Sequence, residues 1–196
     1  MKTGYIVLIS IILLVVISVS WVWSSHNKMV GKDQEASGKW ADVQAAYQRR
    51  MDLIPNLVST VQGAANFEKS TLTAVIEARA KATSVTIDPS HMTADNLKQF
   101  DAAQGQVTSS LSRLLVAVEQ YPDIKATQNF RDLQSQLEGT ENRINVARQR
   151  FNDAVQDYDS YIKFFPQNLF SSSWGFQERP YFTADQAASK APEVKF

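Results

Sequence analysis

The chain has 196 residues, enough for one domain of ordinary size with attached segments. Its 20 Lys and Arg residues equal its 20 Asp and Glu residues, which argues against a nucleic-acid partner, because gripping the phosphate backbone needs a basic excess or a basic face. The lack of cysteine excludes disulfides, thiolate metal sites and cysteine nucleophiles.

The first feature along the chain is an uncharged apolar run at residues 5–23, after a short N-terminal tail at residues 1–4. A helix over this run would span roughly 28 Å, close to the ~30 Å hydrocarbon core of a bilayer. Tyr5 at one end, and Trp21 and Trp23 at the other, are typical of the aromatic belts at membrane interfaces. We therefore predict a single-pass transmembrane anchor, with the lipid bilayer as its partner.

A cleaved signal peptide is the alternative interpretation, and Lys2 followed by the small residues Ser18 and Ser20 would suit it. The run is long for a signal peptide, however, and bulky tryptophans follow the candidate cleavage site. Positive charges do not decide the orientation, because Lys2 and the amino terminus stand against three lysines beyond the run, namely Lys28, Lys32 and Lys39.

Residues 24–38 are polar, and Gly31 and Gly38 predict a linker there rather than a helix continuing from the membrane. Beyond the linker, apolar residues recur at steps of three and four, as on one face of a helix. This pattern predicts an all-α fold, with the transmembrane helix followed by an antiparallel bundle of three to four long helices over residues 39–166. The expected helices are 39–66, kinked or broken near Pro55; 67–83, capped by Asn66; 94–121, capped by Thr93; and 127–165, capped by Thr127.

The last of these helices carries a strict seven-residue repeat of large apolar side chains, which predicts coiled-coil-like packing with a left-handed supercoil. Within the bundle this stripe would face the other helices. The alternative is that it pairs with a second copy of the chain and builds a homo-oligomer. The repeat consists of Phe130, Leu137, Ile144, Phe151, Tyr158 and Phe165.

The C-terminal tail, residues 167–196, is too irregular for a helix and too aromatic for ordinary disorder, and its end from residue 184 is a polar extension. Its aromatic side chains either dock back on the bundle or form a strip that contacts a partner or the membrane. The candidates for docking are Phe170, Trp174, Phe176, Tyr181 and Phe182.

Nothing in the sequence has the spacing of a catalytic or metal site. Neither His26 nor His91 has a glutamate three residues before it, as a di-metal site in a helical bundle requires, and no glycine cluster has phosphate-loop spacing. The sequence therefore predicts no catalytic residues, no metal, no cofactor and no small-molecule substrate. A hydrolase that uses carboxylates alone, drawn from Asp52, Glu138 and Glu141, is a remote alternative.

Two charged clusters remain, one on the first helix and one on the last. They are either solvated faces, or they meet across the bundle and fix the helix register or an oligomer contact. Gly139 and Thr140 in the second cluster predict a close helix crossing there. The candidate residues are Arg49, Arg50, Asp52 and Asn56 in the first cluster, and Glu138, Glu141, Asn142, Arg143, Arg148 and Arg150 in the second.

Several long stretches resemble the LemA family. They cover about residues 40–182 in order, and they include RRMDLIPNLVSTVQG from Arg49, NFRDLQSQLEGTENRINVARQRFNDAV from Asn129 and GFQERPYF from Gly175. LSRLLVAVEQYPD from Leu111 and FPQNLF from Phe165 also resemble the family pattern. The resemblance implies a bacterial protein with a helical domain on an N-terminal anchor, and a family with no established enzymatic activity to which a magnetosome-membrane protein belongs.

These observations predict a non-enzymatic scaffold or accessory protein of the bacterial inner membrane, which organises membrane-protein partners or copies of itself. A membrane-shaping oligomer is the alternative. The YQRRMDLIPNLV stretch from Tyr47 resembles the lipoprotein-bearing branch of the family, so we expect the bundle on the extracytoplasmic side, with the cytoplasmic side as the alternative.

Overall fold

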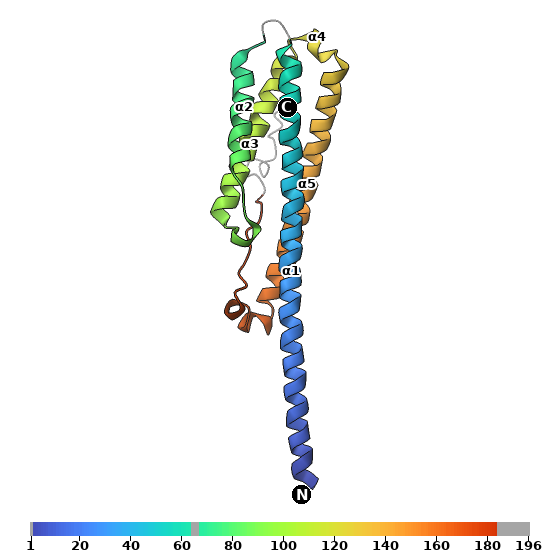
Figure 1. Ribbon diagram of the computed structural model, residues 1–196, viewed down its shortest axis with the longest axis vertical. Helices are drawn as coiled ribbons and strands as arrows, with labels where there is room; N and C mark the ends of the chain where they lie inside the picture. Colours follow the sequence, from blue (N-terminus) through green and yellow to red (C-terminus); the bar gives the residue numbers. More distant parts are fainter. Residues whose placement is uncertain (1, 64–66, 184–196) are drawn as a thin grey trace, which may run out of the picture.

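The computed structural model describes residues 2–63 and 67–183, and this part of the chain is helical, with no strand. Its four long helices run alternately up and down, so the fold is the expected all-α antiparallel bundle (Figure 1). The elements are α1 (Lys2–Gln62), α2 (Lys69–Ser84), η1 (Pro89–His91), α3 (Ala94–Val118), α4 (Pro122–Lys125), α5 (Gln128–Lys163), η2 (Gln167–Leu169) and η3 (Ser172–Trp174).

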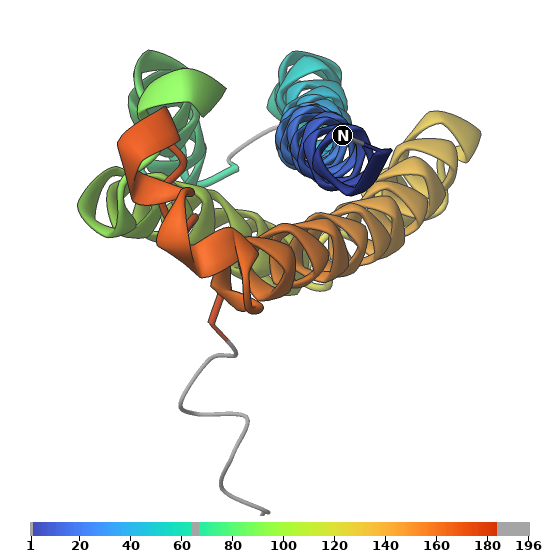
Figure 2. The ribbon, with the colours of Figure 1, turned by 90° about the horizontal axis from the view of Figure 1, so that it is seen from below.

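The bundle consists of two closely packed antiparallel helix pairs. Helix α1 lies against α5 over much of its upper length, and α2 lies against α3. The view along the long axis shows the two pairs facing each other (Figure 2). The connector between α2 and α3 is short, which favours their antiparallel pairing, whereas α1 and α5 pair although they are far apart in the sequence.

Residues 24–38 are not a linker, because α1 continues through them without a break. Packing explains the difference: Ser25, Met29 and Ala36 are buried, so this stretch already belongs to the bundle. Two glycines each cost only about 1 kcal/mol in a helix, and tertiary burial of one face outweighs that cost. The bundle therefore begins at about residue 25 rather than at residue 39.

Pro55 also lies inside α1 without ending it, so of the expected kink or local break, the break is wrong. A proline has no N–H, and here it leaves the carbonyl of Met51, four residues earlier, without its helical donor. The Nε of Arg79, on α2, donates to that carbonyl at 3.0 Å. A side chain from the neighbouring helix thus replaces the missing hydrogen bond.

Two of the expected helix caps are confirmed. Thr93 accepts a hydrogen bond from the backbone of Asn96 in a reciprocal capping box, and Thr127 caps α5. The third expected cap, Asn66, lies outside the described residues, and α2 begins at Lys69.

The repeat on α5 forms the spine of the core. Its first five members are buried, and Ile144 and Phe151 are 1% and 0% exposed. Phe165 was expected to be the sixth member, but it is 78% exposed. The reason is that α5 ends at Lys163, so Phe165 leaves the helix face that the repeat defines.

The N-terminal part of α1 projects beyond the bundle as a bare helix (Figure 1). Its apolar residues are exposed, and its most apolar window has a mean hydropathy of 2.8. Among the described residues α1 alone is long and apolar enough to cross a membrane.

Replacing Phe151 with alanine is expected to lower the free energy of unfolding by about 3–5 kcal/mol, because it leaves a large cavity in the core. Urea denaturation of the full-length protein in mild detergent, followed by circular dichroism, measures this. The control is Val116→Ala at a position that is 70% exposed, where a change within about 0.5 kcal/mol is expected. Equal effects of the two variants would contradict the assignment of the repeat to the core.

Candidate interaction site on helices α1 and α5

The centre of the bundle holds a buried arginine. Arg50 is 2% exposed, and its guanidinium donates to Glu141 on α5 at 3.0 Å. It also donates to two residues of α3: the side-chain oxygen of Gln104 at 2.8 Å and the hydroxyl of Thr108 at 2.9 Å. Arg50 therefore ties α1 to both α3 and α5. Through Arg50 and Glu141 the two charged clusters meet across the bundle, which was one of the two alternatives for them.

This polar layer divides the apolar core. In the orientation of Figure 1, the cluster that contains Trp40 lies below this layer, toward the N-terminal end of α1, and the cluster that contains Leu57 lies above it. The Arg50 guanidinium lies 5.0 Å from the ring centroid of Tyr47, where a cation–π contact partly compensates for lost hydration. Its Nε atom is buried without a hydrogen-bond partner among the described residues.

A second polar bridge lies below the first. Arg148, on α5, forms an ion pair with Asp101 on α3 at 2.9 Å, and it donates to the hydroxyl of Tyr47 at 3.4 Å. Burial raises the pKa of Tyr47, although the nearby arginines oppose that effect. The hydroxyl consequently stays protonated at neutral pH.

Other candidate residues do not join these layers. Asp52 accepts a hydrogen bond from Gln48, and Glu138 accepts one from Gln134, so each is held on its own helix. Asn56 is exposed. Gly139 is also exposed, and a Cβ atom added there would meet nothing within 4 Å, so the close crossing predicted at this glycine is wrong.

The remaining candidates line a groove on the surface between α1 and α5. The groove has a volume of about 570 Å³. Arg49, Arg143 and Arg150 are exposed along it, and none of them has an ion pair or a side-chain hydrogen bond among the described residues. The acidic residue in the lining, Asp42, already pairs with Lys39. Asn142 and small side chains, Ala45, Ala46, Thr140, Val146 and Ala147, complete the lining.

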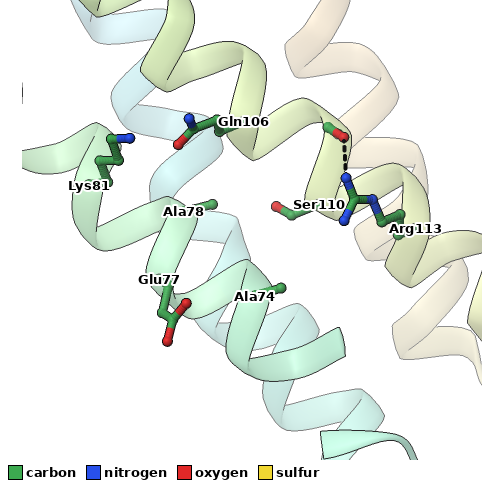
Figure 3. Close-up of a pocket in the computed structure, with 8 residues that line it drawn as sticks. Ala74, Glu77, Ala78, Lys81, Gln106, Ser110 and Arg113 are labelled. Atoms are coloured by element: carbon green, nitrogen blue, oxygen red, sulfur yellow. Dashed lines mark hydrogen bonds between the residues drawn. The ribbon is translucent and has the colours of Figure 1, made fainter. Parts of the chain in front are cut away.

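A second, smaller hollow of about 320 Å³ lies between α2 and α3 (Figure 3). Its charges are mixed, with Glu77 and Lys81 on α2 and Arg113 on α3. Arg113 donates to Ser109 on its own helix at 3.3 Å. This hollow therefore offers no concentrated charge of one sign.

The described part of the C-terminal tail packs on the lower bundle. Phe182 is buried, stacks on Trp40 with 5.9 Å between ring centroids, and lies under the Arg148 guanidinium. Asn152, on α5, holds the backbone of Phe182 with two hydrogen bonds of 2.9 Å. Phe170 stacks on Trp174, Trp174 and Phe176 both contact the His26 ring edge-to-face, and Tyr181 is 42% exposed.

Arg179, which sequence reasoning did not single out, holds the tail in place. Its side chain is 10% exposed and forms an ion pair with Asp33 on α1 at 2.8 Å. It also donates to the hydroxyl of Ser37 and to the carbonyl of Pro89 in η1. The signal in the sequence was its position in the GFQERPYF motif, but its partners are more than 80 residues away along the chain.

Asp159 anchors the same segment from α5. It is 3% exposed, accepts from the backbone N–H of Arg179 at 3.1 Å, and receives a hydrogen bond from the Tyr181 hydroxyl. Burial raises the pKa of the Asp159 carboxyl, although these hydrogen bonds oppose the rise. Burial, together with the Asp159 charge, raises the pKa of Tyr181 to about 12.

Comparison with known proteins identifies the chain. The model of the LemA family matches residues 39–196, which is most of the sequence. The chain belongs to the LemA family. The motifs that bear the resemblance thus include the buried Arg50 and the Arg179 that holds the tail.

Three relatives of this LemA family protein are only distantly similar to it. Magnetosome protein MamQ 2 of Paramagnetospirillum magneticum is 24% identical over 87% of the chain and 69% of its own length. Magnetosome protein MamQ of Magnetospirillum gryphiswaldense is 24% identical over 80% and 64%, respectively. Protein LemA of Metamycoplasma hominis is 22% identical over 82% and 69%. These similarities, with the apolar N-terminal helix, indicate a membrane-associated protein.

Replacing Arg50 with alanine is expected to lower the free energy of unfolding by about 3 kcal/mol, because it leaves Gln104 and Glu141 without their shared donor. Denaturation of the full-length protein in detergent measures the loss. The matched control is Arg49→Ala, which removes the same charge from the adjacent, exposed position, and here a change within about 0.5 kcal/mol is expected. If both variants unfold alike, the buried layer does not hold the helices together.

Proposed function

We propose that this protein is a non-enzymatic scaffold anchored in the bacterial inner membrane, and that its arginine groove binds an acidic segment of a membrane-protein partner. The groove is the observation that carries the proposal. Three exposed arginines line it without a partner among the described residues, and its floor consists of small side chains. Arginine recognises carboxylates with two parallel hydrogen bonds, so a free arginine cluster favours an acidic ligand.

The position of the groove favours a protein partner over lipid. Arg49 follows Trp23 by 26 residues in one continuous helix, which corresponds to about 39 Å along its axis. Headgroups of the bilayer that α1 enters lie too far below to reach it. A partner with an extended domain or tail beside the same membrane would meet the groove at a fixed height.

The carboxylates of the remote hydrolase alternative do not support catalysis. Asp52 and Glu138 are exposed and bound to neighbouring glutamines, and Glu141 is the partner of Arg50. A glycosidase pair needs two free carboxyl groups facing one cleft. None of the three lines either groove described above.

A second candidate, a membrane-organising oligomer, draws its support from the similarity to the magnetosome proteins MamQ. It requires a discrete oligomer when the full-length protein is extracted in mild detergent. The scaffold with an acidic partner is compatible with a monomer. A monomer in light scattering would therefore refute the membrane-organising oligomer and leave the scaffold standing.

The resemblance to the lipoprotein-bearing branch favours the extracytoplasmic side for the bundle. In intact cells, a membrane-impermeant maleimide is then expected to label a Val116→Cys variant, because that position is 70% exposed and the chain has no other cysteine. Labelling only after the cells are broken would place the bundle in the cytoplasm.

The groove is tested with a synthetic acidic peptide. A fluorescent glutamate-rich decapeptide is expected to bind the full-length protein in uncharged detergent, and added salt is expected to weaken the binding. Arg143→Gln combined with Arg150→Gln should raise the dissociation constant by about tenfold or more, since both charge-assisted contacts are lost.

The matched control for this test is Arg113→Gln combined with Arg131→Gln. It removes the same two charges from exposed positions outside the groove. This control variant is expected to bind the acidic peptide like the unchanged protein. Equal weakening in both double variants would mean that the peptide responds to net charge alone, which would refute the groove as a site.

A further inference from the structure

The lower end of the bundle carries a cluster of exposed apolar side chains that the proposed function does not use. Phe164, Phe165 and Leu169 are 64%, 78% and 63% exposed. They lie within six residues of each other, at the end of α5 and in η2, which packs against it. Other exposed large apolar residues of the bundle, such as Val116 and Ile76, stand singly, and only clustered ones indicate a binding surface.

The height of this cluster follows from contacts between α1 and α5. The hydroxyl of Ser25 lies 3.3 Å from the hydroxyl of Tyr161, and the side chain of Met29 packs with Ile162. Helix α5 runs antiparallel to α1 and ends at Lys163, so its end points toward the N-terminal end of α1, and η2 packs against this end. Trp23, the last residue of the apolar run, precedes Ser25 by only about 3 Å along the helix.

The cluster therefore lies at the level where α1 would enter the membrane. Figure 1 shows the bundle ending where the bare part of α1 begins, and Figure 2 shows α5 beside α1 when viewed from that end. A bilayer around residues 5–23 would have its interface close to the end of α5 and to Trp174 and Phe176, which contact His26, and the exposed cluster lies in the same short segment.

The composition of the segment suits an interface. Residues 164–177 contain no Asp, Glu, Lys or Arg, but they include four phenylalanines and a tryptophan. Aromatic and uncharged polar side chains are favoured at the level of the lipid headgroups. The nearest charge, Lys163, pairs with Glu178, so both charges at the borders of the segment are partly neutralised.

We propose that Phe164, Phe165 and Leu169 insert into the interfacial layer of the leaflet through which α1 leaves the membrane. The partner of this surface is the lipid bilayer itself, because the cluster is continuous in height with the membrane anchor. The insertion gives the bundle a second point of attachment and fixes its tilt. The proposal rests on α1 as an anchor, but it is independent of the arginine groove.

The lack of cysteine makes a direct test possible. Single variants Phe165→Cys and Leu169→Cys in the full chain are spin-labelled and reconstituted in vesicles of phosphatidylcholine and phosphatidylglycerol in equal parts. Electron paramagnetic resonance then compares collisions with lipid-soluble oxygen and with a water-soluble nickel chelate. At both positions the nickel collision rate is expected to be at most about one third of the rate at an aqueous reference.

Two control positions make the outcomes distinguishable. Val116→Cys, 70% exposed at the far end of α3, provides the aqueous reference, and Ile12→Cys, 54% exposed in the apolar run, reports whether α1 is in lipid. If Ile12 is protected and both base positions collide with nickel as often as Val116, the anchor stands and the proposal fails. If Ile12 is also accessible, the membrane anchor itself is wrong.

A second copy of the chain is the other surface that would cover the cluster. Spin–spin broadening at Phe165 that disappears on dilution with unlabelled protein would reveal such a contact and would overturn insertion into lipid. Protection from nickel that persists at high dilution, without broadening, supports it. Because the labelled side chains are exposed, the variants are expected to keep the helical circular dichroism of the unchanged protein.

Discussion

The pairing of α1 with α5 is the constraint on which the rest of this structure depends. Helix α1 has two parts of different character: its first part is apolar on all sides, and its second part packs in the bundle. Pairing with α5 begins at Ser25, directly beyond the apolar run, and continues past Arg50. No free hinge therefore separates the two parts among the described residues of α1.

The polar layer at Arg50 gives this pairing a defined register. Apolar side chains alone tolerate small shifts of one helix along another, since their contacts are not directional. A guanidinium that must reach Gln104, Thr108 and Glu141 at once allows little such freedom. Removing one partner of such a buried pair is costly, because the other polar groups are then left without compensation.

The sequence predicted helices and core better than it predicted junctions. Periodicity located α3 and α5 within a few residues, because a buried stripe leaves its spacing in the sequence. Glycine at 31 and 38 misled the prediction of a linker, since propensity is a weak local effect that packing overrides. Phe165 led to an error of the opposite kind, because this residue keeps the spacing of the repeat although α5 has already ended at Lys163.

The candidate site was partly visible for the same reasons. Both charged clusters could be named from the sequence, but their division into a buried layer and an open groove depends on the rotation of each helix. Arg50 and Arg49 are adjacent in sequence, yet one is buried and the other is exposed. The role of Arg179 was not predictable from spacing, because its partners come from α1 and from η1.

Because α1 is continuous, the rotation of its apolar N-terminal part about the helix axis fixes the rotation of its part in the bundle. Successive residues of a helix differ by about 100° around its axis. The angle between any chosen side of the apolar part and the side that carries the groove is therefore fixed. Inserting a single residue near position 24 would turn one relative to the other by about that angle without changing any side chain of either. The direction in which the groove faces, relative to the apolar N-terminal part, is thus set by the number of helical residues between them.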